Sequence, residues 1–162
     1  MNGSGNRPVR ILLVCLGNIC RSPMAEGILR HLTNMENFPL EADSAGTADY
    51  HTGEAPDRRA VDACADSGID ISPLRARQLV HADFYCFDWI LAMDRNNLRH
   101  VQGMAPLEHA CRVGLFLDPG GRHPVEERSV PDPYYGRADA FHQCFQTLYS
   151  GARILLGQHL FS

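Results

Sequence analysis

The arrangement that most constrains the fold is an alternation of short apolar segments with amphipathic ones. Residues 9–14 read Val-Arg-Ile-Leu-Leu-Val, which is typical of a β-strand buried on both faces. Similar apolar segments follow at Pro39–Asp43, Trp89–Met93 and Val113–Leu117. Since helical patterns separate the four segments, we expect a single-domain α/β fold with a four-stranded parallel sheet and helices on both faces.

Four helical patterns fill the intervals between and after these segments. The first begins at Ser22 and Pro23, an N-cap followed by a proline at the first helical position, and apolar residues then recur every four positions. The others are expected over Glu54–Ser67, Asp94–Gly103 and Arg137–Leu156. Ligands of such sheets bind at the carboxyl ends of the strands, so the segment after the first strand is a candidate site.

Composition excludes several functions. All fifteen basic residues are arginine, so the chain lacks the lysine of Schiff-base enzymes and of Walker phosphate loops. The formal net charge of −4 argues against nucleic-acid binding, and no apolar run reaches the length that spans a bilayer. Residues 1–8 lack the order of a signal peptide. They predict a flexible tail before a domain at 9–162, in a cytoplasmic protein.

The segment from Cys15 to Ser22 combines a nucleophile with an anion site. Backbone N–H groups at the start of a helix can converge on a tetrahedral oxyanion, and the planar guanidinium of Arg21 matches two phosphate oxygens. We expect Cys15 to face the positive end of the helix, which favours the thiolate, the nucleophilic form of cysteine. The residues expected to surround the anion are Leu16, Gly17, Asn18, Ile19 and Cys20.

Several stretches of the sequence are similar to one known family. Val14–Pro23 resembles the signature loop of the low-molecular-weight protein tyrosine phosphatases, and Asp132–Tyr135 resembles the Asp-Pro loop that this family carries late in the chain. Asp43–Thr47 and Ala92–Asp94 also match family patterns, and the likeness covers nearly the whole chain from Val9 onward. It implies a flavodoxin-like sheet and the metal-independent hydrolysis of phosphotyrosine in proteins and of small aryl phosphates, without a cofactor.

The resemblance also implies a role for each main residue of the two loops. Cys15 attacks the phosphoryl group and forms a phosphocysteine, while Asp132 acts first as general acid and then as general base. Arg21 and the loop N–H groups stabilise the equatorial oxygens of the transition state. Ser22 forms a hydrogen bond with the Cys15 sulfur and so improves it as a leaving group.

Supporting and substrate-binding residues follow from the same resemblance. Asn18 braces the loop, in left-handed conformation, with Ser44 as its expected partner. Tyr134 and Tyr135 follow the acid in sequence. Two interpretations are open: one of them forms an aromatic wall for the phenyl ring of the substrate, or both only pack against the rest of the protein. Tyr50 lies where the family often has an aromatic residue on the opposite wall.

One stretch departs from the family pattern. In Pro73–Gln78, Leu74 stands where the best-studied members have a histidine that helps to tie down the loop asparagine. The network that braces the loop must therefore be smaller or differently built, which concerns the rigidity of the loop rather than its chemistry.

Cys20 leaves two interpretations open. It is either a small buried filler or a thiol that forms a reversible disulfide with Cys15 under oxidant and so protects the nucleophile. The second interpretation makes the protein redox-sensitive.

Other functions compete with this hypothesis. Thiol-dependent arsenate reductases share the loop, but they need two further cysteines close together, and Cys64, Cys86 and Cys111 are more than twenty residues apart. Protein arginine phosphatases of the same family tend to have threonine after the loop asparagine, where this chain has Ile19. A catalytically dead phosphopeptide-binding module would be expected to lack the nucleophile or the acid. A domain that binds some other anion is the least specific alternative.

The expected partners follow from the substrate. They are phosphotyrosine-containing proteins, with a bacterial tyrosine kinase among them by family analogy, and phosphate or another oxyanion in the loop. We expect no nucleic acid, no membrane and no metal, since the cysteines and the eight histidines lack ligand spacing. The expected assembly is a monomer or a weak dimer.

Overall fold

A computed structural model of the chain describes residues 7–158. Its sheet has four strands, all parallel, in the order β2-β1-β3-β4. They are β1 (Val9–Cys15), β2 (Leu40–Gly46), β3 (Trp89–Ala92) and β4 (Arg112–Leu115). The expected four-stranded parallel sheet is confirmed, and β1 lies in its interior as the apolar character of residues 9–14 predicts.

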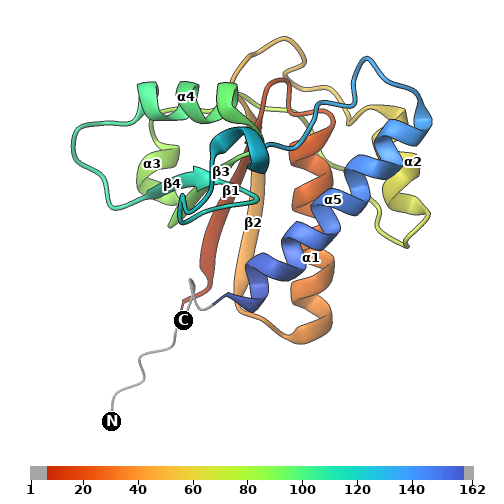
Figure 1. Cartoon of the computed structure of the whole chain (residues 1–162), viewed down its shortest axis with the longest axis horizontal. Helices are drawn as coiled ribbons and strands as arrows, with labels where there is room; N and C mark the ends of the chain where they lie inside the picture. The colour runs from red at the N-terminus through yellow and green to blue at the C-terminus, as the bar shows by residue number, and fades with distance from the viewer. Residues whose placement is uncertain (1–6, 159–162) are drawn as a thin grey trace.

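Helices cover both faces of this sheet, as expected of right-handed crossovers. Figure 1 shows α1, α2 and α5 gathered on one side of the strands and α3 and α4 on the other. The helical elements are α1 (Arg21–Glu36), α2 (Arg58–Ala65), α3 (Asp83–Cys86), α4 (Arg95–Met104), the 3-10 helix η1 (Val125–Arg128) and α5 (Ala138–Gly157).

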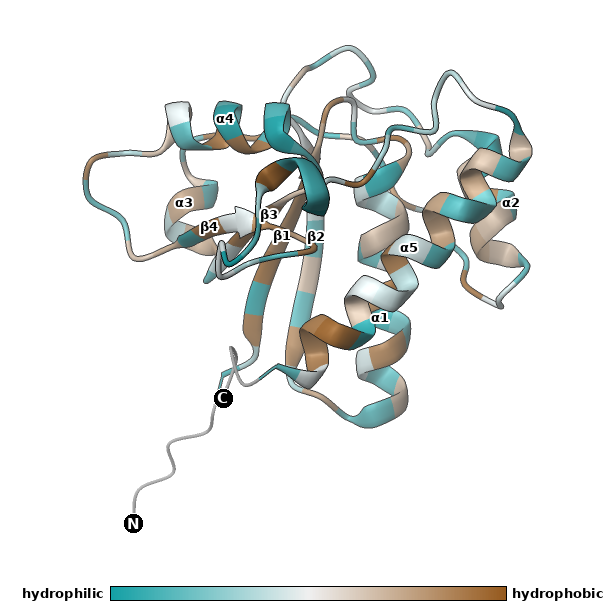
Figure 2. Ribbon diagram, viewed as in Figure 1, coloured by the Kyte–Doolittle hydropathy of each residue, from teal (hydrophilic) through white to brown (hydrophobic). Residues whose placement is uncertain are grey.

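The central strand supplies two hydrophobic cores because its side chains alternate between the faces of the sheet. Ile11, Leu13 and Cys15 belong to the cluster under α1, α2 and α5, whereas Leu12 and Val14 belong to the cluster under α3 and α4. All five side chains are buried. Figure 2 shows hydrophobic residues on much of β1, with hydrophilic residues on much of α4. The nucleophile candidate therefore points toward the α1 side.

The local sequence explains where two helices begin. The helix expected from Glu54 begins only at Arg58, because Pro56 breaks the earlier pattern and the Asp57 carboxylate accepts from the backbone N–H of Arg59 as the N-cap. The prediction of Ser22 as the N-cap of α1 is wrong. Cys20 occupies the cap position without a side-chain cap bond.

Other boundaries and two short elements differ from expectation. β4 stops at Leu115, two residues early, because Asp118 donates its backbone N–H to the Leu115 carbonyl and turns the chain. α3 and η1 were not predicted, and each has only four residues, which is too short for a hydrophobic period to show.

The strand ends meet at one edge of the sheet and create the site. Thr47 after β2 donates its backbone N–H to Cys15, and Met93 after β3 donates to Val14. The tail expected over residues 1–8 lies mostly outside the described residues, although Arg7 pairs with Asp88 at 2.7 Å. No helix within residues 7–158 is both long and apolar enough to cross a membrane.

Candidate active site

The loop between β1 and α1 has the form of an anion cradle. Cys15 ends β1 with only 3% of its surface exposed, and α1 begins at Arg21. Among the described residues, the backbone N–H groups of residues 16–20 donate to no carbonyl or side-chain oxygen. These amides precede the first turn of a 16-residue helix, whose dipole adds to their attraction for an anion.

A chain of hydrogen bonds fixes the nucleophile inside the loop. The Ser22 hydroxyl lies 3.0 Å from the Cys15 sulfur, and the Asn18 amide nitrogen donates to Ser22 Oγ at 2.8 Å and to Ser44 Oγ at 2.9 Å. Asn18 has φ of 57°, so the expected left-handed conformation and the expected Ser44 contact are both present. Because Ser22 lies inside the helix rather than at its cap, its hydroxyl is available to the sulfur.

A second layer extends this chain to a buried carboxylate. Ser44 Oγ donates to Glu26 Oε1 at 2.7 Å, and Arg30 Nη1 lies 2.9 Å from Glu26 Oε2, at ion-pair distance but without hydrogen-bond alignment. Burial raises the pKa of Glu26, while the bonds from Ser44 and the charge of Arg30 act in the opposite direction. Sequence reasoning missed Glu26, since nothing local shows that a helix residue meets Ser44.

The segment that lacks the family histidine still braces the loop. Leu74 packs against the core on the α1 side, so it makes no polar contact in this network. Instead the backbone N–H of Arg77 donates to Asn18 Oδ1 at 3.0 Å. A main-chain amide thus satisfies the asparagine oxygen, in agreement with the expectation of a differently built network.

Arg21 is held in position by groups from two other elements. Its Nη1 donates to Asp94 Oδ2 at 2.6 Å and to the Val130 carbonyl at 3.0 Å, and the residue is 2% exposed. Asp94 is itself fixed, because its other oxygen caps α4 through the backbone N–H of Asn97. The sequence analysis predicts Asp94 as a helix cap and as part of the family-like stretch Ala92–Asp94, but it predicts no contact with Arg21. Asp94 lies two residues after the end of β3, and β3 ends level with Val14 of β1, so its place in the sequence is the signal that could have revealed this contact.

Asp132 lies beside this guanidinium. Asp132 Oδ2 is 3.5 Å from Arg21 Nη2, and Oδ1 accepts from the backbone N–H of Tyr134 at 3.1 Å. Its side chain is 37% exposed, whereas Pro133 beside it is buried. The carboxylate is therefore at the mouth of the anion loop and in contact with solvent.

A cavity of about 200 Å³ joins the two loops. Its lining includes the buried Cys15 and Arg21 and the more exposed Asp132. The rim is aromatic: the rings of Tyr134 and Tyr135 are edge-to-face at 5.0 Å, and His51 faces Tyr134 at 6.4 Å. The other lining residues are Leu16, Gly17, Ile19, Cys20 and Tyr50. All three predicted tyrosines thus border the cavity, although Tyr50 is 74% exposed.

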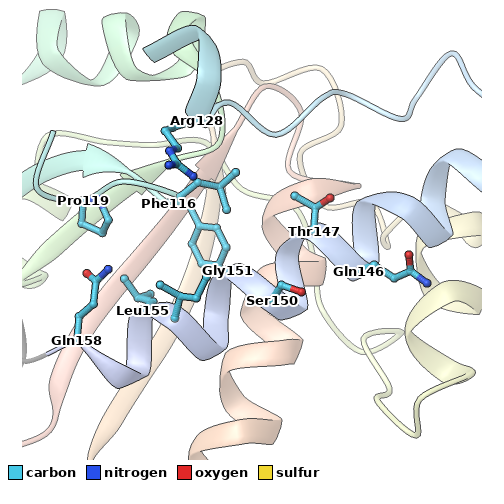
Figure 3. Close-up of a pocket in the computed structure, with 11 residues that line it drawn as sticks. Phe116, Pro119, Arg128, Gln146, Thr147, Ser150, Gly151, Leu155 and Gln158 are labelled. Carbon is cyan, nitrogen blue, oxygen red and sulfur yellow. The ribbon is translucent and has the colours of Figure 1, made fainter. Parts of the chain in front are cut away.

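A larger hollow of about 390 Å³ lies elsewhere, between α5 and the segment after β4. Figure 3 shows Phe116, Leu155 and Gly151 at its floor and Arg128 at its edge. The described residues that line it include no thiol, imidazole or carboxylate. Cavity size alone therefore does not identify the reactive site.

Within residues 7–158, no three His, Cys, Asp or Glu side chains are grouped so as to hold a metal ion.

Comparison with known proteins agrees with the geometry. The sequence profile described as "Low molecular weight phosphotyrosine protein phosphatase" matches residues 10–160. The Schizosaccharomyces pombe protein of that description is 42% identical over 142 residues, 85% of this chain and 88% of the relative. The structure of Primo-1 has a TM-score of 0.85 at 30% identity, covering 94% of this chain and 99% of the other. The Drosophila arginine phosphatase DARP has a TM-score of 0.83 at 32% identity, covering 91% and 95%.

Fold and site together define an α/β enzyme that binds an oxyanion in a loop between a strand and a helix. Within that class, the chain belongs to the low molecular weight phosphotyrosine protein phosphatase family. The family suggested by the two loops is thereby confirmed, and the match extends over residues 10–160.

Proposed function

We propose that this protein hydrolyses phosphotyrosine in proteins, and small aryl phosphates, through a phosphocysteine intermediate on Cys15. The observation that carries the proposal is the meeting of Cys15, Arg21 and Asp132 around one cavity of about 200 Å³ with an aromatic rim. Neither step of the reaction needs a metal ion or a cofactor.

In the first step the phosphoryl group enters the loop with its oxygens on the free backbone amides and on Arg21. The Cys15 thiolate attacks phosphorus, and the bond between phosphorus and the phenolic oxygen breaks. Asp132, protonated at this stage, gives its proton to the departing oxygen. Asp94 keeps the Arg21 guanidinium aimed at the equatorial oxygens while charge develops on them.

In the second step water hydrolyses the phosphocysteine. Asp132, now a carboxylate, takes a proton from the water as its oxygen attacks phosphorus, and the bond between phosphorus and sulfur breaks. Ser22, 3.0 Å from the sulfur, donates a hydrogen bond to the thiolate that leaves. Inorganic phosphate is released and the enzyme returns to its starting state.

The rim supports an aromatic leaving group. Tyr134, Tyr135, Tyr50 and His51 all line the cavity, so a phenyl ring that enters it meets aromatic side chains. Ile19, 8% exposed at the cavity, offers an apolar contact and no hydrogen-bond acceptor for a guanidinium.

Phosphoarginine is the second candidate substrate, because the fold is similar to that of the Drosophila arginine phosphatase DARP. Rates on matched phosphotyrosine and phosphoarginine peptides separate the two. We expect the tyrosine peptide to be preferred, and Ile19→Thr to shift the preference toward phosphoarginine. Comparable rates on both peptides by the native protein would remove the tyrosine preference.

The first experiment is hydrolysis of p-nitrophenyl phosphate with EDTA present, from mildly acidic to neutral pH. We expect robust turnover that is abolished in Cys15→Ser and lowered by about 10²–10⁴-fold in Asp132→Ala. No turnover by the reduced native protein would exclude the phosphatase. It would favour arsenate reduction or simple anion binding.

Cys20 supports a redox role for the same loop. If Cys15 is oxidised to the sulfenic acid, the Cys20 thiol displaces water from it to form a disulfide, which a thiol reductant reopens. Burial raises the pKa of Cys20, so this attack is slow and the thiol is otherwise inert. We expect dithiothreitol to restore the activity of the native protein after mild peroxide treatment. Equal recovery by Cys20→Ala would show that Cys20 is only a filler.

The setting of the protein is also part of the proposal. The domain spans 9–162 after a short tail, and the protein acts in the cytoplasm as a monomer or weak dimer. Its proposed substrates are phosphotyrosine-containing proteins, with a bacterial tyrosine kinase among them by family analogy. Sedimentation over a concentration series tests the assembly, and a substrate-trapping Asp132→Ala variant tests the partner.

A further inference from the structure

One arginine joins the start of α2 to the loop that carries Asp132. Arg59, in the first turn of α2, donates from Nη1 to the Gly136 carbonyl and from Nη2 to the Tyr134 carbonyl, both at 3.0 Å. Both acceptors lie within four residues of Asp132. Figure 1 shows the segment that enters α5 passing beside α2, so two parts of the chain that are far apart in sequence meet here.

The guanidinium is held from behind by Asp57. Arg59 Nε is 3.0 Å from Asp57 Oδ1, and Nη2 is 2.9 Å from Oδ2. The same carboxylate caps α2 by accepting from the backbone N–H of Arg59. These hydrogen bonds lower the pKa of Asp57, so the pair stays charged at neutral pH.

Asp57 in turn is attached to the anion loop. Its backbone N–H donates to the Ile19 carbonyl at 2.8 Å. A continuous path of hydrogen bonds therefore runs from the loop of the nucleophile, through the N-cap of α2, to the loop of the acid. This path fixes the distance between the two loops without passing through the cavity.

Aromatic contacts restrict the guanidinium further. Its central carbon lies 4.4 Å from the centre of the Phe141 ring, which is fully buried, and 5.8 Å from the centre of the Tyr134 ring. Only about a third of the Arg59 side chain is exposed. The group therefore has one preferred orientation, with two of its N–H donors directed at the acid loop.

The acid loop has few other internal supports. Gly136 donates its backbone N–H to the Pro133 carbonyl at 2.8 Å, which closes a tight turn, and Asp132 accepts from Tyr134. A side chain at Gly136 would come within 2.7 Å of Ala140, so the turn is tightly packed against the start of α5. Before Asp132 the loop is held by Val130, which binds Met93 and Arg21, and after Asp132 the turn is held against α2 by Arg59.

We infer that Arg59 is a positioning residue for Asp132: it fixes the acid loop against the anion loop so that the carboxyl group reaches the leaving oxygen. This inference rests on the proposed role of Asp132 as general acid. Among residues 7–158, the hydrogen bonds that lead from Arg59 to the anion cradle run through Asp57, and the charge of Arg59 also acts on Cys20 of the cradle.

The test is the dependence of kcat/KM on the leaving group, because only a basic leaving group needs the proton of the acid. We expect Arg59→Met to lower kcat/KM by about 10–100-fold for phenyl phosphate and by less than about 3-fold for dinitrophenyl phosphate. Arg58→Met is the matched control: Arg58 is on the same helix, its side chain is 86% exposed, and among residues 7–158 it pairs only with Asp62. It should leave both substrates unchanged.

A double variant makes the inference sharper. In the Asp132→Ala background, Arg59→Met should add less than about 3-fold for phenyl phosphate, because the acid it positions is already absent. Additive losses, or equal losses on both substrates in the single variant, would overturn the positioning role. If Arg59→Met does not fold, Arg59→Lys keeps the charge but cannot span Asp57 and both carbonyls, and should show the same selectivity.

Failure of this inference can be told apart from failure of the proposed function. If Asp132→Ala itself loses activity equally on both substrates, the acid assignment is wrong. If Asp132→Ala is selective and Arg59→Met is not, only the role of Arg59 is overturned.

Discussion

The two loops that form the cavity are held in opposite ways. In the anion loop, Asn18, Arg21 and Ser22 are at most 3% exposed and are tied to α1, β2 and the end of β3 by buried hydrogen bonds. The acid loop exposes Asp132 and is held from outside by Arg59. One loop is therefore part of the core, and the other lies on the surface.

The difference has a physical cause. Buried polar groups must be satisfied by fixed partners, since leaving one unsatisfied costs about 1–3 kcal/mol, so the anion loop has a single geometry. The acid has to take up and release a proton, which requires contact with water. We conclude that damage to the anion loop should affect stability and activity together, whereas damage to the acid loop should affect activity alone.

The largest expected effect is the loss of the nucleophile. Cys15→Ser should lower turnover of p-nitrophenyl phosphate by at least about 10⁴-fold, because a hydroxyl in this site has no base to activate it. Binding of inorganic phosphate, measured by calorimetry, should survive, because the loop amides and Arg21 remain. Arg21→Met is the converse control and should lose phosphate binding. A Cys15→Ser protein that no longer binds phosphate would mean that the sulfur also shapes the cradle.

The next effect concerns the acid loop. Asp132→Ala should lower kcat/KM for phenyl phosphate by about 10²–10⁴-fold and change the free energy of unfolding by less than about 0.5 kcal/mol, because its side chain is exposed at the surface. Urea unfolding beside steady-state kinetics checks both quantities. A large loss of stability would contradict the contrast between the loops.

Much of the site could be predicted because its chemistry is local. Cys15, Asn18, Arg21 and Ser22 lie within eight consecutive residues, where the strand, the tight loop and the helix can be recognised from hydrophobic pattern and turn chemistry. The Ser44 partner came from the family resemblance.

The residues that were missed act over long distances in the sequence. Asp94 meets Arg21 across 73 positions, and Arg59 meets Tyr134 across 75. The helix patterns predict that Asp94 is a cap and that Arg59 lies within a helix, but only the packed sheet and helices determine which loop each one faces. Tertiary contacts of this kind produce no hydrophobic periodicity that could be recognised in a single sequence.

A smaller effect is expected from the brace of the anion loop. Asn18→Ala removes buried bonds to Ser22, Ser44 and Arg77 and places a Cβ-bearing residue without a polar side chain at φ of 57°. Stability should fall by about 2–4 kcal/mol and activity by up to about 10²-fold. Asn18→Gly tolerates the left-handed backbone and should recover about 1 kcal/mol of stability without recovering activity. Full activity in Asn18→Ala would show that the loop does not need this brace.

The smallest expected effect is a pH dependence from the buried end of the same network. Burial raises the pKa of Glu26 above its ordinary value of 4.5, so the folded state holds this proton more tightly than the unfolded chain does. The native protein should therefore lose stability, relative to Glu26→Gln, as pH rises from about 4.5 through the raised pKa. The slope cannot exceed about 1.4 kcal/mol per pH unit for one group. Urea unfolding at several pH values measures it, with Glu36→Gln at the exposed end of α1 as the control. If the difference in unfolding free energy between the two proteins does not change with pH, Arg30 fully offsets the effect of burial on the pKa of Glu26. Ser44 would then bind a carboxylate paired with Arg30 rather than a carboxyl group that is hard to ionise.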